Sequence, residues 1–418
     1  MEKRKNPAVR FKGFEDDWEQ RKLVNVVERI TRKNDNFEST LPLTISAQYG
    51  LIDQNEFFDK RVASKDISGY YLVRKGEFAY NKSTSTDAPW GAIKRLERYE
   101  NGVLSTLYIV FKILDEDEMN SDYLVCYYET DLWHKGIQMI AAEGARNHGL
   151  LNIAPADFFE TVLTMPKDVE EQKQIGQYFQ QLDHLITLHQ RKLEKMQLVK
   201  KSMLEKMFPK NDLKIPEIRF EGFTDDWEQR KFSELVQIER GGSPRPIDDF
   251  ITNAPNGLNW VKIGDAPAQG NYITKTAEKI RPEGLSKTRE VHPGDLILSN
   301  SMSFGKPYIM GIDGCIHDGW LLIRNTHGVF DLTFLCHLLG TPQMLSQYKS
   351  LAAGSTVNNL NKELVGNTVV TIPSIAEQRV LGDYLEQLDN LITLHQSKLK
   401  SSEFLYKIFL GNSVSWES

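Results

Sequence analysis

The sequence contains the same opening twice. Residues 10–23 read RFKGFEDDWEQRKL and residues 219–232 read RFEGFTDDWEQRKF, which gives eleven identities in fourteen positions at an offset of 209. A second match ends each half, where QLDHLITLHQ at 181–190 and QLDNLITLHQ at 387–396 share nine of ten residues at an offset of 206. Solenoid repeats have periods of only about 20 to 50 residues. The 418-residue chain is therefore expected to hold two copies of one domain, each followed by a helix.

The stretches between these matched ends share almost no sequence. One echo aligns Val73-x-x-Gly76-Glu77-Phe78-Ala79-Tyr80 with Val291-x-x-Gly294-Asp295-Leu296-Ile297-Leu298. Each is a glycine turn followed by a short apolar run, which is typical of a tight turn that leads into a strand. The two middles are expected to share a fold while presenting different surfaces.

Each half ends in a long stretch with a single apolar stripe. The apolar residues recur in steps of mostly three and four, which predicts one face of a helix. About forty residues make a helix of roughly 60 Å, and one stripe on so long a helix needs a partner. An antiparallel coiled coil of the two helices is expected, with a helical bundle inside one domain as the alternative. The stripes consist of Ile175, Phe179, Leu182, Ile186, Leu193, Met196 and Met203, and of Leu381, Leu385, Leu388, Ile392, Leu399, Leu405 and Phe409.

Two histidines, His189 and His395, occupy equivalent positions of these stripes. Their recurrence raises the possibility of a metal or catalytic site. A hydrogen-bonded histidine at a core position is the commoner arrangement, and it is the one expected here.

The composition describes a globular chain with an acidic balance. Hydrophobic residues make up 40% and charged residues 26%, and 51 Lys and Arg against 57 Asp and Glu give a net charge of −6. Bulk charge therefore gives no argument for nucleic-acid binding. The three cysteines, Cys126, Cys315 and Cys336, form no CxxC pattern. Neither a zinc site nor a disulfide framework is expected, and without a signal peptide or an apolar run long enough for a membrane span the cytoplasm is the expected location.

No catalytic motif is present. The sequence lacks GxGxxG, GxxxxGK[ST] and GxSxG, which removes the dinucleotide, P-loop and hydrolase interpretations. Gly305-Lys306 fails as a phosphate loop because residue 300 is Asn, and Asp87-Ala88-Pro89-Trp90 lacks the first of the two prolines that an amino-methyltransferase motif needs.

Two weaker catalytic patterns also have simpler explanations. A nuclease site could use Asp157 with Glu171-Gln172-Lys173, but the latter is better explained as a solvated helix start. His317-Asp318 has no nucleophile or metal set beside it in the sequence. The chain is therefore expected not to be an enzyme.

The duplicated RFxGFxDDWEQRK openings, the paired helices and the divergent middles together resemble the specificity (S) subunits of type I DNA restriction-modification systems. The resemblance covers essentially the whole chain. It is also carried by Gly241-Gly242-Ser243-Pro244, by Asn259-Trp260-Val261-Lys262-Ile263-Gly264-Asp265, and by a proline followed by Glu-Gln at each helix start. Those starts are Pro166 with Glu171-Gln172 and Pro373 with Glu377-Gln378.

The resemblance implies an α/β (α+β) fold with two similar target-recognition domains, separated by two antiparallel helices, around a pseudo-two-fold repeat. The expected segments are 1–165 and 211–372 for the recognition domains and 166–210 and 373–418 for the helices. Each domain would read half of a split, non-palindromic DNA target. The implied partners are double-stranded DNA, two modification subunits that methylate adenine at N6, and restriction subunits. S-adenosylmethionine, ATP and Mg would bind those partners, and no metal or cofactor is expected on this chain.

Base reading needs polar side chains on loops that can enter a groove. Three kinds of segment are candidates: the loop before the return to each helix, which is 144–149 in the first half; the segment after each glycine turn; and residues 240–245, where Gly241 and Gly242 would let the backbone approach phosphate. An ordinary solvated turn is the alternative for each residue. Trp18 and Trp227 are expected to be packing anchors. The candidate residues are Arg146, Asn147, His148, Thr356, Asn358 and Asn359; Tyr80, Asn81, Lys82, Ser83, Ser299, Asn300, Ser301, Ser303 and Lys306; and Arg240, Ser243 and Arg245.

The constant segments are expected to contact the modification subunits, because what recurs in both halves should serve something that also occurs twice. A basic flank follows the first repeated decapeptide and could face DNA or be simply solvated. A coiled-coil scaffold that binds proteins and no DNA is the competing function. The basic flank comprises Arg191, Lys192, Lys195, Lys200, Lys201, Lys206 and Lys210.

Overall fold

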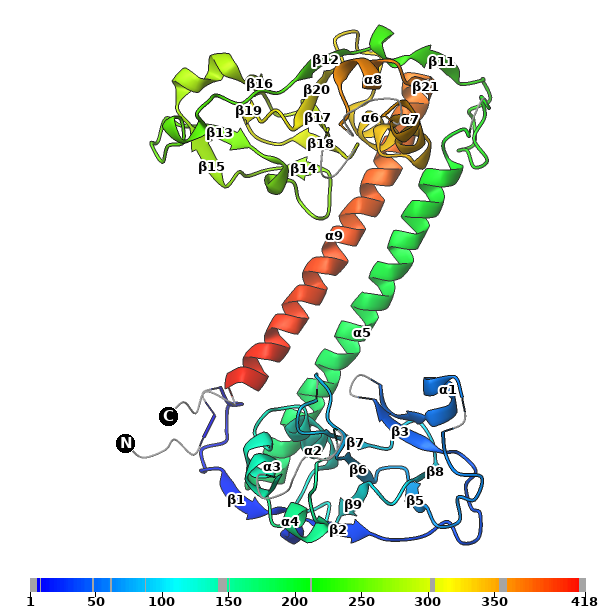
Figure 1. The fold of residues 1–418 in the computed structure, drawn as a ribbon, viewed down its shortest axis with the longest axis vertical. Helices are drawn as coiled ribbons and strands as arrows, with labels where there is room; N and C mark the ends of the chain where they lie inside the picture. Colours follow the sequence, from blue (N-terminus) through cyan, green and yellow to red (C-terminus); the bar gives the residue numbers. More distant parts are fainter. Residues whose placement is uncertain are drawn as a thin grey trace. The chain divides into compact units, whose positions relative to one another are not determined.

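The computed structural model describes residues 6–7, 9–46, 49–60, 62–86, 88–141, 149, 151–210, 213–300, 305–352 and 359–412, with side chains to residue 408 at the last helix. These residues form both helices and strands, with more residues in helices than in strands (Figure 1). The chain divides into two compact units, one of Met1–Leu188 with Leu399–Ser418 and one of His189–Lys398. Two 38-residue helices, α5 (Val169–Lys206) and α9 (Ile375–Asn412), contribute residues to both units.

The first unit is built on small antiparallel sheets. Its central sheet has the order β2-β9-β6-β7, and the pairs β1-β10, β3-β4 and β5-β8 accompany it. The strands are β1 (Glu19–Lys22), β2 (Val27–Ile30), β3 (Leu43–Ser46), β4 (Gly50–Asp53), β5 (Tyr71–Arg74), β6 (Phe78–Asn81), β7 (Ala92–Arg95), β8 (Asn101–Leu104), β9 (Ile109–Ile113) and β10 (Val162–Met165). The short helices are α1 (Gln54–Phe58), α2 (Ser121–Tyr128), α3 (His134–Ala141) and α4 (Pro155–Phe159), with a 3-10 turn η1 (Leu23–Asn25).

The second unit has a five-stranded sheet, β12-β20-β17-β18-β14, a four-stranded sheet, β15-β13-β19-β16, and the pair β11-β21. Only β14-β18 and β13-β19 are parallel among the strand pairs of the described residues. The strands are β11 (Glu228–Lys231), β12 (Gln237–Arg240), β13 (Leu258–Val261), β14 (Tyr272–Ile273), β15 (Glu278–Ile280), β16 (Arg289–Val291), β17 (Leu296–Ser299), β18 (Pro307–Met310), β19 (Gly314–Ile316), β20 (Trp320–Arg324) and β21 (Val369–Ile372). The helices are α6 (Leu332–Leu339), α7 (Pro342–Ala352) and α8 (Lys362–Gly366), with 3-10 turns η2 (Phe232–Glu234), η3 (Ile247–Asp249), η4 (Ile263–Asp265) and η5 (Pro282–Lys287).

The central sheets of the two units repeat one topology. The order β2-β9-β6-β7 corresponds position by position to β12-β20-β17-β18. The glycine turns before β6 and β17 also match: Gly76 and Gly294 have φ angles of 87° and 94°, where a residue without Cβ is favoured. Their amides donate to equivalent carbonyls, of Leu96 and Met310, both at 2.8 Å. The expectation that the two divergent middles share a fold is confirmed.

The duplicated opening binds the start of each long helix through a buried carboxylate. In the first unit Arg10 donates two hydrogen bonds to Glu171, at 2.6 and 2.7 Å, and the Trp18 indole N–H donates a third at 3.3 Å. This set is called the helix clamp below. Glu171 is fully buried. The hydrogen bonds that Arg10 donates to this carboxylate raise the pKa of the Arg10 guanidinium.

The second unit has the same clamp in the same geometry. Arg219 donates to Glu377 at 2.7 and 2.8 Å and Trp227 at 3.3 Å. Pairing of β1 with β10 and of β11 with β21 has the same register in both units, with Glu19 opposite Met165 and Glu228 opposite Ile372. The residues that the two openings share thus attach each opening to its long helix.

The glutamine after each clamp carboxylate fixes the helix to a neighbouring short helix. Gln172 accepts from the amide of Asn120 at 2.9 Å, and Gln378 accepts from the amide of Asp331 at 3.0 Å. Asn120 and Asp331 in turn cap α2 and α6. Each glutamine also donates to the carbonyl of the preceding proline, at 3.0 and 3.1 Å. Both glutamines are buried, and their side chains satisfy backbone groups at this junction.

Within the second unit the segments of α5 and α9 are antiparallel. His189 lies against His395 with Nδ1 atoms 3.0 Å apart, and Lys200 pairs with Asp389. In the first unit the ring of Phe179 meets that of Tyr406 at 5.4 Å. The histidines are thus hydrogen-bonded to each other, as the core interpretation expected. Burial and the nearby Lys192 and Lys398 lower the pKa of both.

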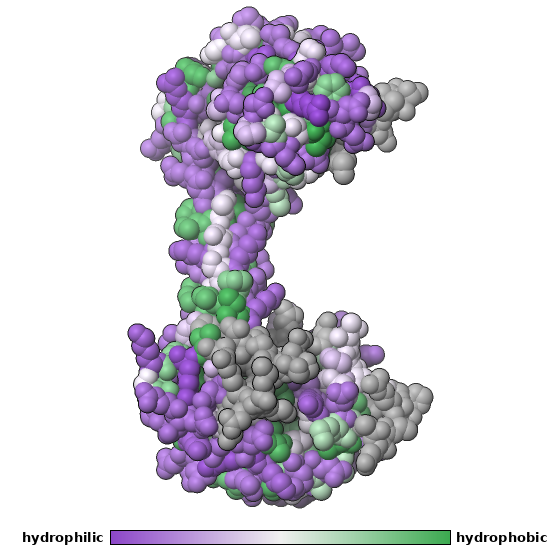
Figure 2. Space-filling view, turned by 90° about the vertical axis from the view of Figure 1, so that its left-hand side faces the viewer, coloured by the Kyte–Doolittle hydropathy of each residue, from purple (hydrophilic) through white to green (hydrophobic). Residues whose placement is uncertain are grey.

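On the face that Figure 2 shows, most of the coloured surface is hydrophilic. Figure 2 shows one face, on which hydrophobic residues gather in small groups rather than in one continuous area. None of the helices formed by the described residues has the length and apolar character that crossing a bilayer requires.

Candidate functional site

Two segments of the second unit that are predicted DNA contacts meet at Asp318, in the connection between β19 and β20. Ser243 donates from Oγ to the Asp318 carboxylate at 3.1 Å, and Arg245 lies 3.6 Å from the same carboxylate. Arg240 donates to the Asp318 carbonyl at 3.4 Å. Residues far apart in sequence therefore form one polar cluster, the Asp318 cluster, which also includes His317 with its Nε2 3.0 Å from the carboxylate.

Asn300 joins the second segment to this cluster and also holds the third. Its side-chain amide donates to the Asp318 carbonyl at 2.8 Å, and its own carbonyl accepts from the amide of Leu360 at 3.0 Å. Leu360 directly follows Asn359, the last residue of the third candidate segment. The strand end at β17 and the return toward α9 are therefore neighbours in space.

The first unit repeats this junction with different side chains. The carbonyl of Lys82, one residue past β6, accepts from the amide of Leu151 at 2.9 Å. The backbone of Thr84 donates to the carbonyl of Gly149 at 2.7 Å, and its hydroxyl donates there at 2.9 Å. The segment after the Gly76 turn thus lies beside Gly149, at the end of the loop that precedes the return to α5. The second unit has the same arrangement. An equivalent backbone carrying different residues is what a variable surface requires.

Three of the predicted contact residues are buried, which corrects the expectation for them. Tyr80 has no exposed surface and donates its hydroxyl to the carbonyl of Trp90 at 2.8 Å, and burial raises the pKa of its phenol. Ser299 and Asn300 are exposed by only 0% and 3%. Their polarity serves hydrogen bonds inside the protein, because a buried polar group needs a partner there.

The glycines at 241 and 242 have a different role from the one expected. A Cβ on Gly241 would lie 2.2 Å from the carbonyl oxygen of His317, and one on Gly242 would lie 2.3 Å from that of Lys287. Close approach to the chain's own backbone, not to phosphate, explains why glycine is needed at both positions.

The other described candidates retain some accessible surface. Ser83, Arg240, Arg245 and Asn359 are exposed, and Arg245 leaves 81% of its side chain accessible. Asn81, Lys82, Ser243 and Lys306 are partly exposed. Burial lowers the pKa of Lys82, whose ammonium donates to the carbonyl of Ile153 at 3.3 Å. Lys306 lies 4.9 Å above the ring of Tyr308.

Seven candidates lie outside the described residues, so their contacts stay predictions: Arg146, Asn147, His148, Ser301, Ser303, Thr356 and Asn358. The basic flank is partly neutralised, because Lys200 pairs with Asp389 while Lys206 and Lys210 pair with Glu217.

No sequence pattern marks Asp318 as an organising residue, because its partners lie up to 78 positions away. His317-Asp318 was considered there only as a catalytic pair. Glu171 was expected to lie at a solvated helix start, and this expectation is wrong: Glu171 is fully buried as a clamp carboxylate because it accepts two hydrogen bonds from Arg10. Within the described ranges, no group of three or more His, Cys, Asp or Glu side chains is placed to hold a metal ion.

Comparisons with known proteins agree with the resemblance found in the sequence. Residues 224–402 match the family model for the type I restriction modification DNA specificity domain. The specificity subunit of the MjaVIII type I restriction enzyme of Methanocaldococcus jannaschii is 25% identical over 260 residues, which cover 59% of this chain and 59% of that protein. A putative MjaX specificity subunit of the same organism is 22% identical over 408 residues, covering 93% of this chain and 90% of the relative.

A solved structure shares the fold. The crystal structure of the type I restriction-modification S subunit from M. genitalium superposes with a TM-score of 0.61 at 14% identity, covering 97% of this chain and 98% of that one. The chain therefore shares the mixed helical and strand fold of that structure.

Proposed function

We propose that this chain, which is similar to the specificity (S) subunits of type I restriction-modification systems, recognises a split, non-palindromic DNA target. Each unit would read one half of the target. The chain supplies recognition and no chemistry, while partner subunits methylate adenine at N6 and restrict unmodified DNA. S-adenosylmethionine, ATP and Mg would bind those partners.

One observation carries the proposal: the two units hold an equivalent junction in place with equivalent backbone bonds, yet present different side chains there. Lys82 and Leu151 form the junction in one unit, and Asn300 and Leu360 form it in the other. A duplicated frame presents its variable residues to duplex DNA in similar poses, so each half-site can differ. Phosphate contacts from partner subunits would relieve the acidic balance of the chain.

Arg245 is the described side chain best suited to base reading in the second unit. An arginine can donate two hydrogen bonds to the O6 and N7 atoms of guanine. Asp318 beside it, itself bonded to Ser243, restricts the orientation of the guanidinium. A held but exposed arginine keeps its donors available for DNA.

The repeated decapeptide favours binding of two copies of one protein partner. Leu185 and Leu391 occupy the same position of that decapeptide, and each leaves 41% of its surface exposed. An exposed leucine repeated at equivalent points of α5 and α9 fits binding of two identical modification subunits. The long helices would pair as a coiled coil that sets the spacer between half-sites, with recognition domains at 1–165 and 211–372 and helices at 166–210 and 373–418. A complex that acts on cellular DNA would work in the cytoplasm.

The test is to map methylated adenines in DNA from cells that carry this chain with its modification subunit. The expected result is one bipartite sequence. Arg245→Ala and Asn359→Ala should relax letters of one half-site only, and Asn81→Ala with Ser83→Ala should relax only the other. Changing Arg146 and Asn147, or Asn358 and Asn359, to Ala tests the remaining loops in the same way.

Duplex-binding assays with and without the modification subunit distinguish this function from a scaffold without DNA readout. Binding of the partner without any sequence preference would favour the scaffold. Methyl transfer or cleavage by the purified chain alone would overturn the proposal.

A further inference from the structure

A polar network joins the five-stranded sheet of the second unit to both long helices, with Asp389 of α9 at its centre. Asn271, directly before β14, donates from its side-chain amide to the Asp389 carboxylate at 2.8 Å, and the ammonium of Lys200 on α5 donates to the same carboxylate. Tyr272 of β14 donates its hydroxyl to Glu386 at 2.9 Å. Glu386 and Asp389 are three residues apart on α9, so they share one face of that helix. These five residues are called the Asp389 network below.

Burial makes the network sensitive to the placement of the sheet. The side chain of Asp389 is 13% exposed and that of Lys200 is 21% exposed. His337 of α6, whose side chain is 3% exposed, has its Nε2 atom 3.6 Å from the same carboxylate. Buried charges cost free energy unless they are paired and hydrogen-bonded. A displaced sheet would take the Asn271 amide away from the carboxylate, so the network favours one position of the sheet on these helix segments.

The strand that carries the two donors extends the central sheet of the second unit. β14 pairs with β18 in parallel, and the amide of Ile309 donates to the carbonyl of Asn271 at 2.7 Å. Among the described residues, the corresponding sheet of the first unit ends at β7. The sheet that β14 extends also contains β17 and β20, which border Asn300 and Asp318. The network therefore connects α9 to the sheet that holds the Asp318 cluster.

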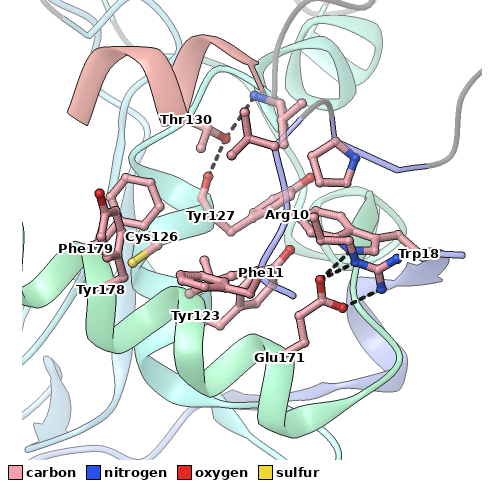
Figure 3. A pocket seen from close by; sticks show the side chains of 14 residues that line it. Arg10, Phe11, Trp18, Tyr123, Cys126, Tyr127, Thr130, Glu171, Tyr178 and Phe179 are labelled. Carbon is pink, nitrogen blue, oxygen red and sulfur yellow. Dashed lines mark hydrogen bonds and ion pairs between the residues drawn. The ribbon is translucent and has the colours of Figure 1, made fainter. Parts of the chain in front are cut away.

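The equivalent point of the first unit is apolar. At the 206-residue offset of the decapeptide, Tyr406 matches Lys200 and Asp183 matches Asp389. The ring of Tyr406 meets that of Phe179 at 5.4 Å, and Figure 3 shows Phe179 among the side chains that line an apolar pocket. Asp183 is exposed. In the part of the chain that the structure describes, the duplicated aspartate therefore forms this network in the second unit only.

We propose that Asp389 is a positioning residue that, through Asn271, holds the recognition surface of the second unit at one place on the long helices. This inference rests on the proposed function and adds what makes the spacer exact. A modification subunit bound to the helices would meet the half-site of the second unit at a fixed distance only while the sheet is fixed. A loosened sheet would accept spacers one base pair longer or shorter, and the half-site sequences would stay the same because no base contact changes.

Methylation of synthetic duplexes tests this with the full chain and its modification subunit. The duplexes carry the mapped target with its native spacer, or with one base pair more or fewer. Asp389→Asn and Asn271→Asp should lower the preference for the native spacer several-fold. Tyr272→Phe removes one hydroxyl from a residue that is 43% exposed, so it should fold, and it should lower the preference in the same direction.

Two further variants serve as controls. The double variant Asn271→Asp, Asp389→Asn exchanges the acceptor and the donor, which allows the hydrogen bond to form again, so it should recover most of the preference that each single variant loses. Asp383→Asn changes an exposed carboxylate of the same helix outside the decapeptide and should leave the preference unchanged.

Two results would overturn the positioning role. One is a native-spacer preference in the folded Asn271→Asp and Tyr272→Phe variants that equals that of the unchanged chain. The other is a change of half-site sequence in these variants, which would make the residues base readers. A complex of the unchanged chain that methylates no bipartite target would overturn the proposed function, and this inference with it, before any variant is compared.

Discussion

Loss of a clamp carboxylate is expected to destabilise its unit strongly. In Glu377→Ala the guanidinium of Arg219, 13% exposed, loses two hydrogen bonds, and the indole N–H of Trp227 loses its acceptor. Removing one partner of a buried ion pair costs about 3–5 kcal/mol, because the other charge stays buried without compensation. For a unit of this size each kcal/mol lowers Tm by roughly 2–4 °C, so a fall of roughly 6–20 °C is expected.

The assay is urea unfolding together with calorimetry, and amide hydrogen exchange assigns the loss to a unit. Glu377→Ala should increase exchange around β11, β21 and the start of α9. Glu171→Ala should do the same for β1, β10 and the start of α5, because its clamp has the same geometry. Glu377→Gln keeps an acceptor for Trp227 and should lose less. Glu221→Ala, on an exposed residue of the same repeat, should change stability by less than about 0.5 kcal/mol. A loss below about 1 kcal/mol in both clamp variants would refute the reasoning.

The remaining predictions concern pH, spacing and recognition. Burial, and secondarily the charge of Lys200, lower the pKa of His337 to about 4. The unfolded chain therefore binds this proton at a higher pH than the folded chain does. The contribution of neutral His337 to the free energy of unfolding is full above about pH 6.5 and is lost as pH falls toward 4. A pH series of unfolding free energies should show a shallower decline in His337→Gln. One extra turn, about 5.4 Å, in both α5 and α9 should lengthen the spacer by between one and two base pairs, at about 3.4 Å each, while the half-site sequences stay constant. Methylome mapping that finds changed half-site sequences at unchanged spacing would contradict the idea that the helices set the spacer. Asp318→Ala should relax the half-site that Arg245→Ala relaxes, because it frees that arginine; an altered letter in the other half-site would argue against this role.

The repeat predicted more of the architecture than of the recognition surface. Residues that recur at the same position of the repeat, such as Trp18 and Trp227, are expected to have similar surroundings. Both donate to a clamp carboxylate, as packing anchors would. Periodicity located the long helices, because a buried stripe must recur with the turn of the helix. Polarity was a poorer guide on the loops. It marked Tyr80, Ser299 and Asn300 as contact residues, but hydrogen bonds inside the protein use those groups.

The sequence by itself determined that the chain is a doubled unit with two long helices, since eleven matched positions and a helical stripe are local patterns that can be read in order. Only the tertiary structure decided which segments meet. Asp318 contacts Arg240 at the end of β12 and Asn300 directly after β17, and Phe208 packs on Trp227 of the second opening. Contacts of this kind depend on how strands pair and helices cross, and the type of a residue does not indicate which residue far away in the sequence it will contact.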